Sequence, residues 1–347
     1  MRVLTVIGNR PQFVKAAAVS GPLRARATEV LVHTGQHYDD DLSRVFFDEL
    51  CLPRPEHRLE LGGGSNTAQT ARMLDALEAL LAAEAPDAVL VYGDTNSTLA
   101  GALAAAQAQV PVAHVEAGMR SYDRRMPEEL NRVLCDHAST LLLCPTEGAA
   151  ENLRREGVRG RVEVVGDVMV DVARIVAPRL GEPGAGGHLL VTAHRAGNVD
   201  DGERLAALVD LILALPGDVV LPMHPRTRVR LAEAGLLHRV LGAVRVTPPL
   251  GYLEFARLLH GARAVLTDSG GVQKEAFLAG IPCVTLRDRT EWTETVAAGW
   301  NTLVDLDLEA ALAALDRPAP TDRPPLYGDG HAGERVVDAL LGIASAA

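Results

Sequence analysis

Three carboxylates in this sequence occupy positions suited to proton transfer. Asp94 ends the apolar run AVLVYGD, Glu116 ends VAHVEAG, and Glu128 begins the helix-like segment PEELNRVLCDHAS soon afterwards. Carboxyl groups that share one sheet edge repel one another and take different proton affinities, as general acid–base catalysis requires. Structural alternatives stay open, because Asp94 could cap a helix and Glu128 could be a first-turn acid favoured by the helix dipole.

The segment TDSGGVQKE is typical of an anion-binding turn. It follows an apolar run, and Ser269, Gly270 and Gly271 lie at the first turn of an expected helix. Backbone N–H groups and the helix dipole favour a pyrophosphate at such a turn, and the glycines let it approach closely. Glu275 is placed to reach a ribose. An ordinary helix capped by Ser269 would explain the same residues without a ligand.

The segment GNRPQFVK has the same pattern after the first apolar run. Gly8 permits a tight turn and Pro11 is favourable at a helix start, so Arg10 and Lys15 become candidates for a phosphate or substrate contact. Of the 34 basic residues only Lys15 and Lys274 are lysines. A compact ammonium group at Lys15 therefore favours a specific contact.

Histidines follow two apolar runs in the second half, His194 in VTAHR and His224 in LPMHPRT. Because no HExxH or other ligand spacing is present, we interpret them as proton donors or phosphate contacts and expect no metal. The GxGxxG and P-loop patterns are absent, and the four cysteines show no CxxC spacing. We therefore expect free thiols and no cofactor.

Two sets of six β-branched apolar runs must position these residues. Helix-like segments alternate with the runs, which is typical of βα units and a parallel sheet. The Pro/Gly-rich stretch 178–187 separates the sets, so we predict domains at 1–170 and 171–328, with a C-terminal helix at 329–347 that packs back on the first domain. Ligands of open parallel sheets bind beyond the carboxyl ends of the strands, and nearly every run ends in polar residues. We therefore expect a cleft between the domains.

Composition excludes several classes of partner. A chain of 347 residues with 48% hydrophobic residues can form two cores, and its net charge of −11 argues against nucleic acid. No apolar run reaches the roughly 18 residues of a membrane span, and no signal-peptide pattern precedes the first run. We expect a cytoplasmic protein without a membrane partner.

The motifs together resemble the non-hydrolysing UDP-N-acetylglucosamine 2-epimerases over nearly the whole chain. The resemblance rests on GNRPQFVK, TGQHYDD, GDTNSTLAGALAA, HVEAGMRS, MPEELNRVL, GDVMVD, HPRT, LTDSGGVQKEA and LRDRTEWTETV, in order and spacing. It implies two Rossmann-like, doubly wound parallel-sheet domains that face a cleft, as in glycosyltransferase-B folds. It also implies a UDP-sugar substrate, usually a homodimer, and neither metal nor nicotinamide.

The resemblance further implies a mechanism for interconverting UDP-N-acetylglucosamine and UDP-N-acetylmannosamine. UDP is eliminated across carbons 1 and 2 to give a 2-acetamidoglucal, and it adds again after the proton returns to the other face of carbon 2. The implied catalytic residues are Asp94, Glu116, Glu128 and His194. The implied UDP-sugar contacts are Arg10, Lys15, Phe255 near the uracil, Ser269, Gly270, Gly271, and Glu275 on the ribose.

Two departures from the family pattern affect control and specificity. Bacterial members bind a second UDP-N-acetylglucosamine as activator, and Gln36, His37 and Arg72 match that site. In this chain QHYDD places Asp39 beside the expected anion, so we predict weak or absent activation. Trp292 stands where many members have an arginine thought to touch phosphate, which affects the choice of sugar.

Four other functions remain open at this stage. They are a 2-epimerase of UDP-2,3-diacetamido-glucuronic acid, a hydrolysing epimerase that releases UDP, a glycosyltransferase of the same architecture, and a nucleotide-sugar-binding module without chemistry. Three clustered acids argue against pure binding, because uncompensated carboxylates near a pyrophosphate cost stability.

Overall fold

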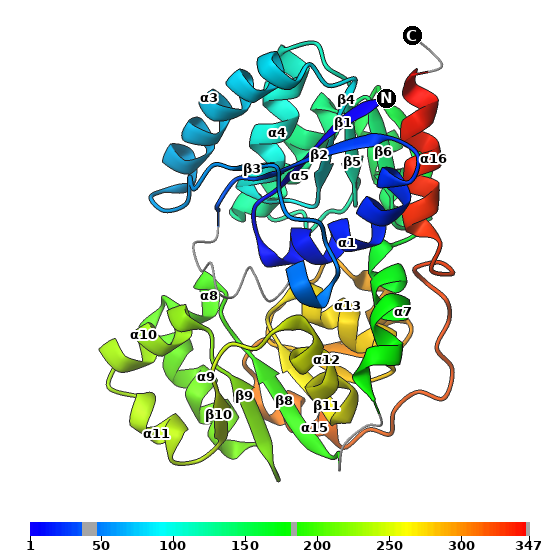
Figure 1. Ribbon diagram of the computed structural model, residues 1–347. Coiled ribbons are helices and arrows are strands. Elements are labelled where there is room, and N and C mark those ends of the chain that lie inside the picture. Colours follow the sequence, from blue (N-terminus) through cyan, green and yellow to red (C-terminus); the bar gives the residue numbers. More distant parts are fainter. Residues whose placement is uncertain (37–46, 182–185, 345–347) are drawn as a thin grey trace. The chain divides into compact units, whose positions relative to one another are not determined.

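The computed structural model describes residues 1–36, 47–181 and 186–344, which form two compact units. The first unit comprises Met1–Val176 and Pro325–Ala347, and the second comprises Ala177–Pro324. The chain therefore leaves the first unit once and returns to it (Figure 1). The boundary lies inside a helix, six residues after the predicted one (176 against 170).

The first unit contains a seven-stranded parallel sheet with the order β3-β2-β1-β4-β5-β6-β7. Its strands are β1 (Arg2–Ile7), β2 (Thr28–His33), β3 (His57–Arg58), β4 (Ala88–Tyr92), β5 (Val112–Val115), β6 (Leu141–Cys144) and β7 (Arg161–Val164). Its helices are α1 (Arg10–Arg24), α3 (Asn66–Glu84), α4 (Asn96–Gln107), α5 (Pro127–Ala138), α6 (Glu147–Glu156), α16 (Ala332–Ala344) and the first part of α7 (Val168–Leu180). Helices cover both faces, so the central strands are buried along their length, which explains their continuous apolar sequences.

The second unit contains a six-stranded parallel sheet with the order β10-β9-β8-β11-β12-β13. Its strands are β8 (His188–Thr192), β9 (Val219–Pro222), β10 (Arg245–Thr247), β11 (Ala262–Thr267), β12 (Cys283–Thr285) and β13 (Asn301–Leu303). Its helices are α8 (Ala196–Val199), α9 (Gly202–Ala214), α10 (Pro225–Glu233), α11 (Leu237–Leu241), α12 (Tyr252–Gly261), α13 (Gly270–Ala279), α14 (Thr293–Ala297) and α15 (Leu308–Leu315). All twelve predicted runs correspond to strands, and only the two-residue β3 was missed.

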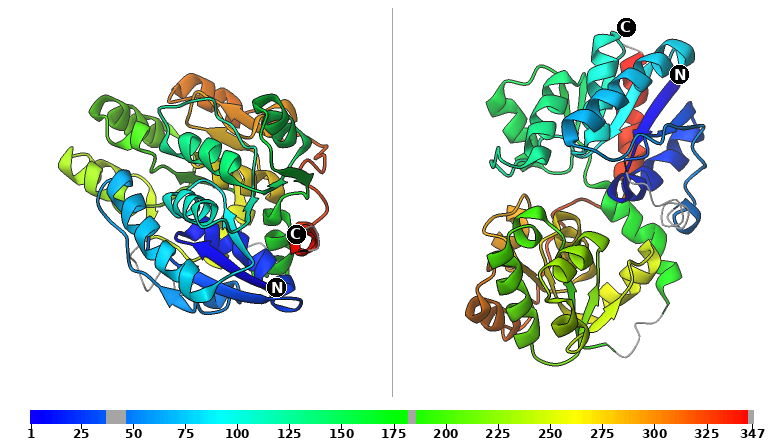
Figure 2. Two further views of the ribbon diagram at one scale, coloured as in Figure 1. Left: turned by 90° about the horizontal axis from the view of Figure 1, so that it is seen from above. Right: turned by 90° about the vertical axis from the view of Figure 1, so that its left-hand side faces the viewer.

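The C-terminal helix α16 packs against α1 and β6 within the first unit, as the adjacent red and blue helices in Figure 2 show. Its first turn is capped from another helix, because the Asp171 carboxylate accepts hydrogen bonds from the backbone N–H groups of Ala332 and Gly333. A Cβ added to Gly333 would lie 2.2 Å from the carbonyl oxygen of Ala18. The glycine therefore allows α16 to approach α1 closely.

Each sheet reverses its strand order at one point, between β1 and β4 in the first unit and between β8 and β11 in the second. At such a point the connections leave toward opposite sides, so the turns after the two strands diverge and leave space for a ligand. The predicted site residues Arg10 and Asp94 follow β1 and β4, and His194 and Ser269 follow β8 and β11. The topology thus places these residues beside the reversal point of their own sheet.

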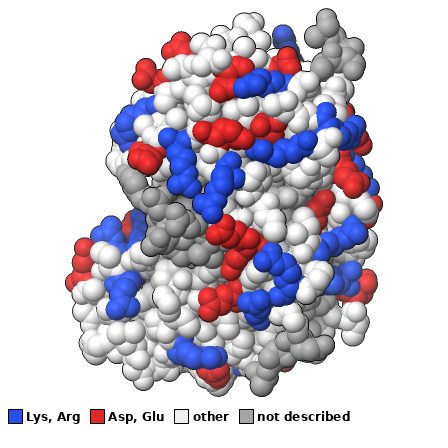
Figure 3. All heavy atoms as spheres, viewed as in Figure 1, with Lys and Arg blue, Asp and Glu red and all other residues white. Residues whose placement is uncertain are grey.

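Acidic and basic side chains are interspersed over the face shown in Figure 3. Within the described ranges, no helix combines the length and apolar character needed to cross a bilayer.

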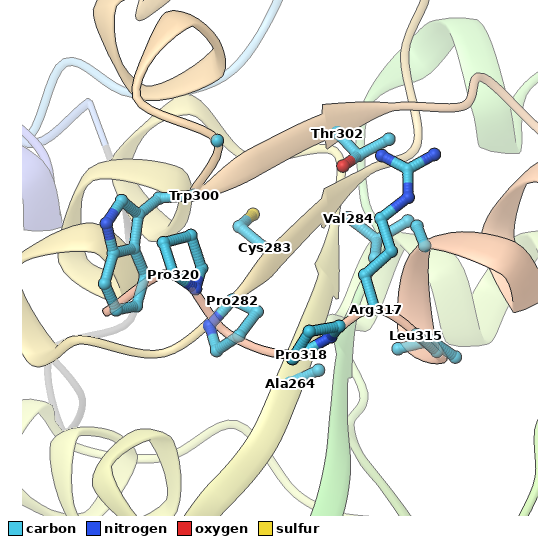
Figure 4. A pocket seen from close by; sticks show the side chains of 12 residues that line it. Ala264, Pro282, Cys283, Val284, Trp300, Thr302, Leu315, Arg317, Pro318 and Pro320 are labelled. Carbon is cyan, nitrogen blue, oxygen red and sulfur yellow. The ribbon is translucent and has the colours of Figure 1, made fainter. Parts of the chain in front are cut away.

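A small pocket of the second unit lies near the amino ends of β11, β12 and β13, opposite the carboxyl ends that the predicted site residues follow (Figure 4). Its lining includes Cys283, Trp300 and the Pro-rich stretch 317–320. The stretch continues to Asp322, whose carbonyl oxygen accepts a 2.8 Å hydrogen bond from Trp300 Nε1. The pocket is therefore remote from the strand ends that carry the predicted site residues.

Position 8 needs a glycine because a side chain would not fit there, whereas the sequence predicted that Gly8 permits a tight turn. A Cβ at Gly8 would lie 2.1 Å from Ser97 Oγ and 2.3 Å from Thr34 Oγ1, and Gly8 is not among the positive-φ residues. We expect Gly8→Ala to destabilise the protein by about 1–3 kcal/mol through overpacking. The thermal unfolding midpoint, followed by circular dichroism, measures this effect.

The matched control is Gly21→Ala in α1, where an added Cβ has no atom within 4 Å. It should stabilise the helix by about 0.5–1 kcal/mol. If Gly8→Ala unfolds at the same temperature as Gly21→Ala, the close approach at Gly8 is wrong.

Candidate active site

Asp94 is the first acid of the candidate site and lies at the end of β4. Thr95, not Asp94, is the N-cap of α4, and it forms a capping box with Thr98. The Asp94 carboxylate instead accepts a 2.6 Å hydrogen bond from Arg132 Nη2, and its carbonyl oxygen accepts one from Asn131 Nδ2 at 3.0 Å. The side chain remains 30% exposed. Asp94 is therefore an ion-paired carboxylate that a ligand can still reach.

Glu116 is the second acid, and it forms an ion pair with Lys15. Its backbone has φ +69°, a left-handed conformation that is uncommon for a residue with a side chain. Gly93 lies next to the pair, because a Cβ there would be 2.9 Å from Lys15 Nζ and 3.3 Å from Glu116 Oε2. Lys15 of the GNRPQFVK motif and Glu116 of the HVEAG motif thus meet beside Gly93, which directly follows β4.

The third predicted acid, Glu128, begins α5 beside a second carboxylate that sequence reasoning missed. Glu129 is 3% exposed and accepts hydrogen bonds from the backbone N–H groups of Ser121 and Tyr122 and from Arg132 Nη1 at 2.8 Å. Burial alone would raise the pKa of Glu129, but these hydrogen bonds together lower it. Glu129 therefore orients Arg132 toward Asp94.

Glu128 is partly exposed and lies one helical turn before Arg132, on the same face of α5. It is also a first-turn acid, so the structural and the catalytic interpretations remain compatible with its position. Arg132 itself could have been found from its i,i+4 spacing to Glu128 in PEELNR.

In the second unit, buried Asp268 organises the turn after β8. Its carboxylate accepts hydrogen bonds from the backbone N–H groups of His194 and Arg195 at 2.9–3.1 Å and from Asn198 Nδ2 at 3.2 Å. His194 Nδ1 lies 3.6 Å from Asp268 Oδ1, so the carboxylate also orients the imidazole. The ring stacks on His224 at 5.1 Å between centroids. Asp268 belongs to the predicted TDSGG motif, but its role was not predicted.

Ser269 is the N-cap of α13, and in the described part of the chain its side chain makes no capping hydrogen bond. The hydroxyl and the N–H groups of Gly270 and Gly271 therefore lie at an uncapped first turn, which suits an anion. Trp292 borders this turn, because a Cβ on Gly270 would be 3.4 Å from Trp292 Nε1. Lys274 Nζ lies 4.3 Å from the centroid of the Trp292 ring. Lys274, the second lysine of the sequence, thus lies against Trp292, which stands where the family resemblance implies an arginine.

The two remaining predicted UDP contacts lie on neighbouring helices of the second unit. Phe255 of α12 is half-buried and packs against the core cluster that contains Leu190 and Val265. Glu275 of α13 is partly enclosed, and burial raises its pKa to about 7 although the Lys274 charge opposes the shift. A carboxyl group with this pKa changes charge near neutral pH.

The described residues predicted for an activator contact the first turn of α4 and the loop before α3. Gln36 Oε1 accepts hydrogen bonds from the backbone N–H and the hydroxyl of Ser97. Arg72 donates to the carbonyl oxygens of residues 61–63, including Gly62 at 3.1 Å. His37 and Asp39 lie outside the described residues, so weak or absent activation stays a prediction.

The sequence and the fold are similar to those of known proteins. The family model described as UDP-N-acetylglucosamine 2-epimerase matches residues 23–341. The chain belongs to this family. A Pseudomonas aeruginosa relative named UDP-2,3-diacetamido-2,3-dideoxy-D-glucuronate 2-epimerase is 47% identical over 98% of this chain and 99% of its own. The family predicted from the motifs is confirmed.

Solved structures of this epimerase family also match along the whole chain. The Methanocaldococcus jannaschii UDP-GlcNAc 2-epimerase in complex with UDP-GlcNAc and UDP has a TM-score of 0.91 and 39% identity, covering 99% of this chain and 100% of that one. The Neisseria meningitidis enzyme bound to UDP-GlcNAc has a TM-score of 0.86 and 29% identity, with the same coverage. These neighbours and the two parallel sheets confirm the predicted glycosyltransferase-B-like fold. Within the described ranges, no group of three or more His, Cys, Asp or Glu residues is arranged to bind a metal.

The raised pKa of Glu275 gives a pH-dependent stability. Between its usual value of 4.5 and about 7, the folded protein retains a proton that the unfolded chain has lost. The free energy of unfolding should therefore fall as pH rises through this window. Glu275→Gln should remove this contribution, which urea unfolding of the full chain at several pH values measures.

Glu254→Gln is the matched control, because Glu254 is an exposed acid in the first turn of α12. Its pH dependence should follow that of the parent. The burial argument fails if Glu275→Gln and the parent lose stability equally over the window.

Proposed function

We propose that the protein is a non-hydrolysing UDP-N-acetylglucosamine 2-epimerase that interconverts UDP-N-acetylglucosamine and UDP-N-acetylmannosamine. The observation that carries this proposal is the set of two acid–cation pairs, Glu116 with Lys15 and Asp94 with Arg132, at the reversal point of the first sheet. We also infer a homodimer, as the family resemblance implies, and a cytoplasmic location, as the composition suggests.

The paired acids suit removal and return of a proton at carbon 2. A neighbouring cation favours the ionised form of a carboxyl group, so both acids can accept a proton. One carboxylate takes the carbon-2 proton, the electron pair forms the double bond between carbons 1 and 2, and the bond to the UDP oxygen breaks. A second acid, which has taken up a proton from solvent, then gives that proton to carbon 2 on the opposite face, UDP adds again at carbon 1, and the first acid returns its proton to solvent. Glu128 is the third candidate for these proton transfers.

The second unit supplies donors for the UDP leaving group. We assign the diphosphate to the uncapped turn at Ser269, Gly270 and Gly271, with His194 as a further donor. His194 is 37% exposed and oriented by Asp268, so with both ring nitrogens protonated its Nε2 can donate to a phosphate oxygen. In this arrangement Arg10 and Lys15 contact the substrate, Phe255 contacts the uracil and Glu275 contacts the ribose.

A second candidate substrate is UDP-2,3-diacetamido-2,3-dideoxy-D-glucuronate. The P. aeruginosa relative named for this sugar is 47% identical, whereas the M. jannaschii relative named UDP-N-acetylglucosamine 2-epimerase is 40% identical over its aligned sequence. Trp292 provides a specific observation, because its uncharged indole lies beside the Gly270 turn, at the position where the family resemblance implies an arginine in many members. A ligand with an additional carboxylate meets a different charge balance at this position.

The reaction is tested by solvent deuterium. Because the proposed intermediate lacks the carbon-2 proton, turnover in heavy water should replace that proton in both recovered UDP-sugars. Proton NMR should show the carbon-2 signal disappear while UDP-sugar remains the product. Turnover with the proton retained contradicts elimination, and stoichiometric release of free UDP indicates a hydrolysing enzyme.

The acid variants test the assigned residues. Asp94→Asn, Glu116→Gln and Glu128→Gln should each lower kcat by at least about 10²-fold, because each removes a group that transfers protons. UDP affinity, measured by calorimetry, should stay near that of the parent and acts as the control for folding. A Glu116→Gln variant with parental kcat would not have lost a catalytic group.

The substrate is tested by presenting each UDP-sugar separately. We expect UDP-N-acetylglucosamine to be converted to an equilibrium mixture with UDP-N-acetylmannosamine. Conversion of the diacetamido-glucuronate alone would assign the protein to the second candidate. Trp292→Arg serves as the specificity variant, and its ratio of kcat/KM values for the two sugars should shift toward UDP-N-acetylglucosamine.

A further inference from the structure

His114 occupies a buried position directly beneath the candidate acids. It lies in β5, and its side chain and that of Asp136 in α5 are both 0% exposed. His114 Nε2 is 2.7 Å from the carbonyl oxygen of Gly93, and Nδ1 is 2.8 Å from Asp136 Oδ1. Each ring nitrogen therefore has one close oxygen partner.

The second oxygen of Asp136 is also occupied. It accepts hydrogen bonds from Arg120 Nη1 at 2.7 Å and from the backbone N–H of Gly118 at 3.2 Å. Burial alone would raise the pKa of Asp136, but His114 and Arg120 together lower it below its usual value. Arg120 continues to Glu156 through two hydrogen bonds of 2.7 and 2.8 Å. Asp136 is therefore ionised and accepts on both oxygens.

The partners of His114 determine its proton content. A carbonyl oxygen and an ionised carboxylate only accept hydrogen bonds, so both ring nitrogens of His114 must donate. The ring is then an imidazolium, and the row His114, Asp136, Arg120 and Glu156 alternates in charge and sums to zero. Neighbouring Cys135 stays neutral, because burial raises its pKa well above the usual value.

Two members of the row, His114 and Asp136, each bind one of the turns that carry the candidate acids. His114 donates to Gly93, which precedes Asp94 and contacts the Lys15–Glu116 pair. Asp136 accepts from Gly118, two residues after Glu116. The buried pair of His114 and Asp136 thus fastens the turn after β4 and the turn after β5.

We propose that His114, kept as an imidazolium by Asp136, is a positioning residue that sets the Gly93 carbonyl and with it the geometry of Asp94 and Glu116. This inference rests on the proposed epimerase function. The charge is needed because a neutral imidazole with a proton only on Nδ1 would turn a lone pair toward the Gly93 oxygen. That repulsion would displace the turn, and small displacements of catalytic groups are costly in rate.

The protonation of His114 can be tested without any turnover. The full-length protein is labelled with ¹⁵N in the histidine rings, and the His114 signals are assigned by their absence in His114→Gln. Both ring nitrogens should carry a proton in a two-dimensional NMR spectrum at neutral pH. A bare nitrogen on His114 overturns the proposal, whether or not the protein is an epimerase.

The positioning role is tested with His114→Phe. The phenyl ring occupies the same space but donates no hydrogen bond, so the Gly93 carbonyl oxygen loses its donor, while Asp136 still accepts from Arg120 and Gly118. We expect kcat to fall by about 10-fold or more, in line with the cost of misplaced catalytic groups. KM and UDP affinity should change little, because the UDP contacts lie in the second unit.

Glu29→Gln is the matched control for the loss of a buried polar group. Glu29 is 4% exposed and is hydrogen-bonded to Thr5, Ser20 and Arg24, but it lies near the amino end of β2. It should lose stability and keep its kcat. Equal kcat losses in both variants, or an unchanged kcat in His114→Phe, would show that His114 acts on stability alone.

Discussion

Lys15 and Glu116 come from α1 and from the turn after β5, and they meet because Gly93 between them has no side chain. This contact depends on a buried amide. Gln12 accepts from the backbone N–H of Gly8 at 2.7 Å and donates to the Tyr92 carbonyl at 2.9 Å, so it ties the turn after β1 to the end of β4. The reversal of strand order separates the helices that follow these strands, and the Gln12 bridge keeps their turns together.

The strands were predictable because each is a short β-branched run between helical segments, and burial on both faces needs such a run. Strand β3 was missed because two residues carry no periodicity. The acids were predictable because Asp94 and Glu116 each end a strand of one parallel sheet. Their cations were harder to assign, since Arg132 reaches Asp94 from 38 residues away in sequence. Motifs identify the ends of strands, whereas pairs across the sheet follow only from the three-dimensional arrangement.

Neighbouring residues of the same type can have opposite roles, and burial distinguishes them. Glu129 uses its oxygens on Ser121, Tyr122 and Arg132, so it has little capacity left for a ligand. Glu128 is partly exposed, so a ligand can reach its side chain. A similar division holds between buried Asp268 and the more exposed His194. In both units a buried carboxylate orients a more accessible group, and sequence alone cannot separate the two.

The return of the chain to the first unit has a consequence for biosynthesis. The second unit is one continuous segment, Ala177–Pro324, whereas the first unit needs Pro325 and the residues after it. Helix α16 packs on α1 and β6, and it is synthesised after the whole second unit. Domains fold as units during synthesis, so the segment made second can complete its core while the first unit still lacks a covering helix. The N-terminal half must therefore wait, with part of its apolar surface uncovered, until α16 has been synthesised.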